Sequence, residues 1–118
     1  MINAKIYKDK NGYIKRYKIL GHSDYAEYGS DIVCAGVSAL AQTTLISLVE
    51  VCNIEENKIK YEIDDETGLL DVSLAGNIEA NELEKSQILL KSLVVGINSL
   101  IENYPNYIKL EYGRCNYD

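Results

Sequence analysis

The sequence predicts an α+β fold in which two long helices pack on one mainly antiparallel sheet. Two segments of mixed apolar and polar residues, 2–7 and 13–20, flank Asn11-Gly12, a dipeptide typical of a tight β-hairpin. Two later segments place apolar residues at helical spacing, and alternating segments follow each of them. The element order is therefore ββαββαβ. A chain of 118 residues, 47% of them hydrophobic, is expected to form a single domain, 1–118.

The first predicted helix runs from Asp31 to about Cys52 and follows a loop of small and polar residues, 21–30. Ser30 or Asp31 supplies the N-cap, because a side-chain oxygen there can accept a backbone N–H. We expect one stripe of this helix to be buried: Val33, Val37, Leu40, Ala41, Thr44, Leu48 and Val51. Residues 32–49 carry no charge, but small and polar residues interrupt them, which favours a core helix over a membrane span.

The next two strands are predicted by alternation. Residues 59–63 and 70–74 alternate between apolar and polar side chains, and an acidic turn that ends at Gly68 separates them.

The second helix is predicted by a capping signal and an apolar stripe. Asn81, with Glu84 three residues later, resembles a capping box, and Pro105 stops the helix. The stripe expected to be buried is Leu90, Leu93, Val94, Ile97 and Ile101. A last strand follows at 108–112.

The charge distribution limits the class of partner. The net charge is −6, although residues 1–20 contain five Lys, one Arg and one Asp and so carry +5. An acidic chain is a poor candidate for binding a nucleic-acid backbone, which requires clustered Lys and Arg. It suits a cationic partner better, because opposite charges speed encounter.

The three cysteines, Cys34, Cys52 and Cys115, indicate a reducing compartment and no bound metal. They show no CxxC spacing and one His accompanies them, so a structural zinc site is not expected. Residues 1–10 lack the apolar stretch of a signal peptide. We expect a cytoplasmic protein with free thiols.

Cys34 occupies the third position of the predicted helix if Asp31 is the N-cap. The backbone N–H groups and the dipole at a helix start favour an anion, so we expect the nucleophilic thiolate to be favoured there. The same N–H groups could hold the oxyanion of a tetrahedral intermediate. The alternative is structural, because a free cysteine is often simply a small buried hydrophobe.

His22 is the one histidine of the chain and lies in the loop that leads into this helix. An imidazole beside a thiol can take the thiol proton and later donate it to a leaving amine. Asp31 could orient His22 or merely cap the helix. Ser38, one turn beyond Cys34, could bond the substrate or the dyad, although a serine within a helix more often bonds its own backbone. Cys52 and Cys115 have no nearby histidine and are expected to be inert.

Residues 21–24, GHSD, and 31–40, DIVCAGVSAL, resemble the bacterial ribosomal-processing cysteine protease family Prp, in which a GH pair precedes a D-(I/V)-V-C-A-x-x-S segment. The likeness covers essentially the whole chain. It implies Cys34 as the nucleophile, His22 as the general base and acid, and Gly21, Asp31 and Ser38 as supporting residues. It implies neither a metal nor a cofactor.

The resemblance also implies a substrate and an assembly. Prp proteases remove a short N-terminal extension from the precursor of large-subunit ribosomal protein number twenty-seven. We therefore expect a basic ribosomal precursor as substrate, bound in an extended form at a sheet edge. A homodimer with a mobile loop at 23–30 over the site is expected, with neither nucleic acid nor membrane as a direct partner.

Two alternatives from other classes stay open at this point. A non-catalytic, ribosome-associated binding module would use Cys34 only for packing. A one-cysteine redox sensor would use the same reactive thiol but lacks an obvious resolving cysteine.

Overall fold

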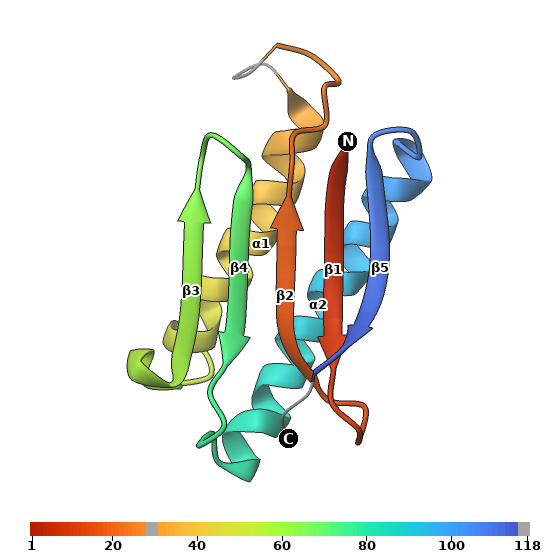
Figure 1. Cartoon of the computed structure of the whole chain (residues 1–118). Coiled ribbons are helices and arrows are strands. Elements are labelled where there is room, and N and C mark those ends of the chain that lie inside the picture. Colours follow the sequence, from red (N-terminus) through yellow and green to blue (C-terminus); the bar gives the residue numbers. More distant parts are fainter. Residues whose placement is uncertain (28–30, 116–118) are drawn as a thin grey trace.

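The predicted order ββαββαβ is confirmed by the computed structural model, which describes residues 1–27 and 31–115. The elements are β1 (Ile2–Lys8), β2 (Ile14–Leu20), α1 (Ile32–Glu50), a short 3-10 turn η1 (Glu56–Lys58), β3 (Ile59–Asp64), β4 (Leu69–Leu74), α2 (Ala80–Asn103) and β5 (Ile108–Arg114). The five strands form one sheet in the order β3-β4-β2-β1-β5, and both helices lie on the same face of it (Figure 1).

The sheet is mainly antiparallel, as predicted. The pairs β1–β2, β2–β4 and β3–β4 are antiparallel, and β1–β5 is parallel. A parallel neighbour needs a long crossover connection, and α2 carries the chain back along the sheet before β5. β3 and β5 are the edge strands.

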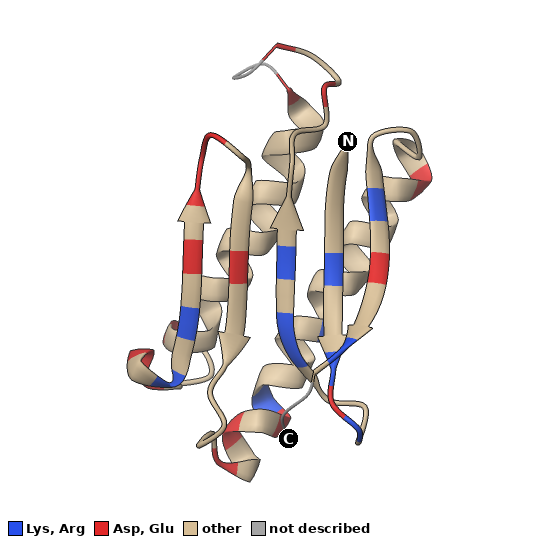
Figure 2. Ribbon diagram, viewed as in Figure 1, with Lys and Arg blue, Asp and Glu red and all other residues tan. Residues whose placement is uncertain are grey.

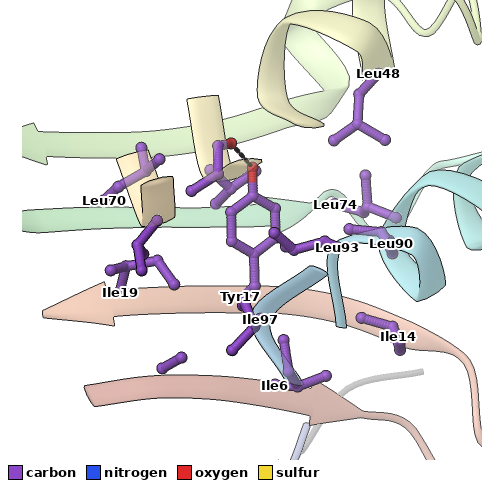
Figure 3. Packing of buried hydrophobic residues seen from close by; sticks show 14 of the residues in the cluster. Ile6, Ile14, Tyr17, Ile19, Leu48, Leu70, Leu74, Leu90, Leu93 and Ile97 are labelled. Atoms are coloured by element: carbon purple, nitrogen blue, oxygen red, sulfur yellow. Dashed lines mark hydrogen bonds between the residues drawn. The ribbon is translucent and has the colours of Figure 1, made fainter. Parts of the chain in front are cut away.

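The core lies between the sheet and the two helices, with Tyr17 of β2 near its centre (Figure 3). The Tyr17 ring is fully buried, and its hydroxyl donates a hydrogen bond of 2.8 Å to the carbonyl of Ala41 in α1. Burial raises the pKa of Tyr17, which keeps this donor neutral. This hydrogen bond thus ties α1 to β2 across the core.

The predicted buried stripe of α1 is confirmed for five of its seven members: Val33, Val37, Ala41, Thr44 and Leu48. Leu40 is partly buried, and Val51 was placed wrongly, because it is 65% exposed. α1 ends at Glu50, so Val51 is the C-cap and leaves the stripe. By length and composition α1 could cross a membrane, but here its stripe forms part of the core.

The start of α2 corrects the predicted cap. The N-cap is Glu79 rather than Asn81, and its side chain and that of Glu82 bond each other's backbone in a capping box. The predicted motif is two residues too late, because Asn is a preferred N-cap residue and Glu is not among the preferred ones. Of the stripe, Leu90, Leu93 and Ile97 are buried, and Val94 and Ile101 are partly buried.

The β1–β2 hairpin turns at the predicted Asn11-Gly12, with Gly12 at φ +86°. Asp9 organises it: its Oδ1 accepts the amides of Asn11 (2.8 Å) and Tyr13 (3.0 Å). Its Oδ2 lies 3.4 Å from Lys15 Nζ, and both side chains are buried. This turn lies at the opposite end of the sheet from the start of α1 (Figure 1).

Candidate active site

Three segments that are far apart in the sequence meet at one end of the sheet. The loop after β2, the first turn of α1 and the turn between β3 and β4 lie together there (Figure 1). The loop carries Gly21 and His22, and the helix carries Asp31, Cys34 and Ser38. The fold therefore brings all five predicted site residues to one end of the molecule.

Cys34 is the third residue of α1, as predicted, and it is partly buried. Its Sγ accepts a hydrogen bond of 3.2 Å from the backbone N–H of Ser23, and it lies 3.4 Å from Ser23 Oγ. The thiol can therefore donate to the serine hydroxyl, whereas a thiolate can accept from the serine amide. The sulfur is held at the surface end of the core and is not sealed inside it.

Asp31 is the N-cap of α1 and joins the helix to the preceding loop. Its Oδ1 accepts the amides of Val33 and Cys34, both at 3.0 Å. Its Oδ2 accepts hydrogen bonds from the Ser23 hydroxyl and from the amides of Tyr25 (3.0 Å) and Ala26 (3.3 Å). Burial raises the pKa of Asp31, but these hydrogen bonds outweigh it and lower the pKa to about 2. The carboxylate is thus ionised at neutral pH.

This cap changes what the helix start can do. Sequence reasoning gave the first-turn N–H groups to a thiolate or an oxyanion, but the amides of Val33 and Cys34 already donate to Asp31. The carboxylate also places a negative charge at the positive end of the helix dipole. These two amides are therefore already engaged and are not available to a thiolate or an oxyanion.

The described part of the loop, residues 23–27, is tied down. Ser23 is buried, and the Tyr25 ring makes edge-to-face contacts with Tyr104 (5.5 Å between centroids) and Tyr107 (5.2 Å). The bonds to Asp31 anchor the loop to the start of α1, and the ring contacts anchor it to the segment at the end of α2. The remainder of the predicted mobile loop, 28–30, lies outside the described residues, as does the alternative N-cap Ser30.

His22 is partly exposed, and its ring contacts the β3–β4 turn. Its Nε2 lies 2.9 Å from the carbonyl oxygen of Glu66. A carbonyl oxygen only accepts, so this contact is a hydrogen bond when the proton of the neutral ring is on Nε2, which leaves Nδ1 as the basic nitrogen.

His22 and Cys34 line two neighbouring cavities. One has a volume of about 100 Å³ and also includes Gly21 and Ser38 in its wall. The other, about 520 Å³, is bordered by Asp31 and Ser38 as well. A group bound between these cavities would therefore face the thiol, the imidazole and the exposed Ser38 together.

Two contributors to the site escaped sequence reasoning. Ser23 contacts both Cys34 and Asp31, and its position beside His22 was the available signal. The Glu66 carbonyl is a main-chain group, for which no residue type provides a signal.

The other cysteines lie away from these cavities and are buried, and burial raises the pKa of the Cys52 thiol. Within residues 1–27 and 31–115, no cluster of three or more His, Cys, Asp or Glu is placed to bind a metal ion.

The sequence matches the family described as "Cysteine protease Prp" over residues 1–109. It is 30% identical over 112 residues to the ribosomal processing cysteine protease Prp of Staphylococcus aureus, covering 95% of this chain and 99% of that protein. The corresponding protease of Bacillus subtilis is 23% identical over 110 residues, covering 93% and 96%.

Solved structures agree. The S. aureus protease in complex with a covalently linked product peptide superimposes with a TM-score of 0.80 at 26% identity, covering 95% of this chain and 99% of that one. The SMU.848 protein of Streptococcus mutans gives 0.80 at 28% identity, covering 98% and 96%. By its family match and its relatives, this chain belongs to the Prp family of ribosomal processing cysteine proteases.

Proposed function

We propose that this protease removes the N-terminal extension of the precursor of large-subunit ribosomal protein number twenty-seven, with Cys34 as nucleophile and His22 as general base and acid. The observation that carries the proposal is that Cys34 and His22 line the same two cavities at the start of α1. The relatives are named for ribosomal processing, and the S. aureus protease was crystallised with a substrate peptide.

The reaction follows from the two groups. His22 Nδ1 takes the Cys34 thiol proton, and the sulfur attacks the carbonyl carbon of the scissile peptide bond. The imidazolium gives its proton to the leaving amine, and a thioester remains on Cys34. His22 then takes a proton from water, the hydroxide adds to the thioester, and the carboxylate product leaves as the thiol re-forms.

A groove beside the site offers an extended peptide a path. The smaller of the two cavities at Cys34 adjoins a further hollow of about 540 Å³ between α1 and the edge strand β3. The two share Gln42, Ile63 and Asp65 in their walls. Ile46 and Tyr61 of this hollow are exposed, at 59% and 53%. An edge strand has unpaired main-chain groups that an extended chain can bond, and apolar hollows beside it can take alternate side chains.

The charges around the site suit a basic substrate. Acidic side chains gather on the loop before α1 and on the β3–β4 turn, at the same end of the molecule (Figure 2). A ribosomal protein precursor is basic, so opposite charges would speed encounter, and added salt would slow it.

Cleavage of a precursor peptide that spans the processing site tests the proposal. The wild-type protein should cut it once, and Cys34→Ala and His22→Ala should each lower the rate by at least about a thousandfold. Cys52→Ala is the matched thiol control and should cut normally. Persistent cleavage by Cys34→Ala would reject the dyad.

The same assay tests the proposed path of the peptide. Ile63→Asp should raise KM more than it lowers kcat, because it alters binding next to the site. A wild-type protein that binds the precursor without cutting it would support the binding-module alternative.

The proposal also includes a cytoplasmic homodimer. The outward faces of the helices leave apolar side chains exposed, with Ile88 at 71% and Val95 at 69%, which a second copy could cover. Light scattering should give twice the monomer mass; a monomer at micromolar concentration would reject this part of the proposal.

A further inference from the structure

The turn between β3 and β4 contacts the loop after β2, which carries Gly21 and His22, through two consecutive carbonyl groups. The Glu66 carbonyl oxygen is 2.9 Å from His22 Nε2, and the Thr67 carbonyl accepts the backbone amide of Gly21 at 3.0 Å. The ring and the backbone before it are therefore held by the same short turn.

Two glycines allow the turn and the loop to come this close. Gly68 has φ +69° and Gly21 has φ +99°, in the left-handed region that side chains rarely adopt. A Cβ added at Gly68 would overlap the carbonyl oxygen of Gly21. Close approach of the two backbones thus depends on Gly68 having no side chain.

The turn has a defined internal structure. Asp64 Oδ1 accepts the amide of Glu66 at 3.0 Å, and the Thr67 hydroxyl lies 3.5 Å from the Asp64 carbonyl. Both bonds are made to Asp64, and they tie together the turn that carries the Glu66 carbonyl. Asp64 and Gly68 also line the cavity that His22 and Cys34 share.

We propose that the β3–β4 turn positions the His22 ring, with the Glu66 main-chain carbonyl as the group that selects its tautomer and Gly68 as the residue that permits the contact. The inference rests on the proposed function, in which His22 is the base. A proton held on Nε2 leaves Nδ1 to act on the thiol. The orienting role that sequence reasoning offered to Asp31 thus falls to a neutral main-chain group.

The ring can be examined directly, because the chain contains one histidine. Two-bond ¹H–¹⁵N correlation spectra of untagged Cys34→Ala protein, at a pH high enough to keep the ring neutral, would assign its tautomer. We expect Nε2 protonated and Nδ1 with the pyridine-type shift. A ring protonated on Nδ1 would overturn the proposal.

Substitution of glycine gives a second, kinetic test. Gly68→Ala should lower kcat about a hundredfold, as a displaced catalytic group does, and leave KM within about threefold. In the Cys34→Ala background it should also shift the ring toward the tautomer mixture of free imidazole. Gly12→Ala has a similar positive φ in open space, and Gly76→Ala has open space without that φ, so both should keep wild-type kcat.

Asp64→Ala covers the case in which Gly68→Ala does not fold. It removes the bond that shapes the turn without adding bulk, so it should lower kcat by about tenfold and change the tautomer ratio in the same direction. The spectra report the tautomer of the His22 ring and do not depend on cleavage of a substrate. They can therefore contradict the positioning role of the turn even if the protein is shown to be a protease. Equally, they can support that role even if the protein cleaves no substrate. Wild-type kcat in folded Gly68→Ala, with an unchanged ring, would reject the proposal.

Discussion

Two buried aspartates lie at opposite ends of the sheet and are held in different ways. Asp9, 4% exposed, accepts two turn amides and forms an ion pair with Lys15. Asp31, 6% exposed, accepts a serine hydroxyl and four main-chain amides. For both carboxyl groups burial raises the pKa, but the hydrogen bonds lower it by a larger amount. The net shift of each pKa is therefore downward.

The difference shows what each carboxylate can do for the molecule. Asp9 closes a hairpin, and its charge is matched by Lys15 inside the fold. Asp31 joins a helix start to a loop that contacts Cys34, and the donors to it are dipoles. Its negative charge therefore remains at the end of the helix that carries Cys34.

The largest expected effect is a loss of stability on substitution of Asp9. Asp9→Asn leaves Lys15 buried without its counter-charge, so the free energy of unfolding should fall by about 3 kcal/mol or more. Urea denaturation measures this loss. Cleavage per folded molecule should stay at the wild-type rate; a parallel loss of kcat would show that the hairpin and the site are coupled.

Asp31→Asn should have the converse effect. Asparagine is as good an N-cap as aspartate, so the bonds to Val33 and Cys34 survive, but an NH₂ group cannot accept from Ser23. We expect kcat to fall about a hundredfold and stability by only about 1–2 kcal/mol. Peptide cleavage and urea denaturation of the same sample measure the two. Normal kcat would mean that Asp31 is a helix cap and nothing more.

Acid titration also tests the bonding of Asp31. The pKa of Asp31 is about 2 in the fold, below its ordinary 3.8, so the unfolded chain binds more protons between these values. Stability from Asp31 is therefore complete above about pH 4 and is lost as pH falls through about 2, by about 2 kcal/mol. Urea denaturation at a series of pH values across this range measures the free energy of unfolding. Its dependence on pH should be flatter for Asp31→Asn than for the wild-type protein. Equal slopes would contradict the bonding described for Asp31.

The smallest effect concerns Ser23. Ser23→Ala removes the hydroxyl that bonds Asp31 but keeps the backbone amide 3.2 Å from Cys34 Sγ. We expect stability to fall by about 1 kcal/mol and kcat by about tenfold or less. Ser92→Ala, which removes a helix-surface hydroxyl bonded to the Ile88 carbonyl, is the matched control. A larger loss of kcat would show that the hydroxyl acts on the thiol itself.

The sequence predicted the fold well because its signals are local and repeated. Asn11-Gly12 and the alternation around it located the first hairpin, and helical spacing located the buried face of α1 at Val33 and Val37. Errors occurred at helix ends, at Val51 and Asn81, where a difference of one or two residues decides whether a side chain is buried or caps a helix.

The site was predictable only in part, for a different reason. Cys34, His22 and Asp31 carry side chains whose chemistry indicates a role. The contact of Ser23 with Cys34 depends on how the loop folds back, and the contact of His22 with the Glu66 carbonyl depends on long-range strand pairing. Main-chain partners of this kind have no residue type by which a sequence could reveal them.

The reactivity of Cys34 is tested by the rate at which each of the three cysteine thiols reacts with iodoacetamide in the native protein, followed by peptide mass spectrometry. At about pH 6, where an ordinary thiol is almost fully protonated, Cys34 should react far faster than Cys52 and Cys115, and His22→Ala should remove that advantage. Equal or slower labelling of Cys34 in the wild-type protein would contradict a thiolate nucleophile activated by His22.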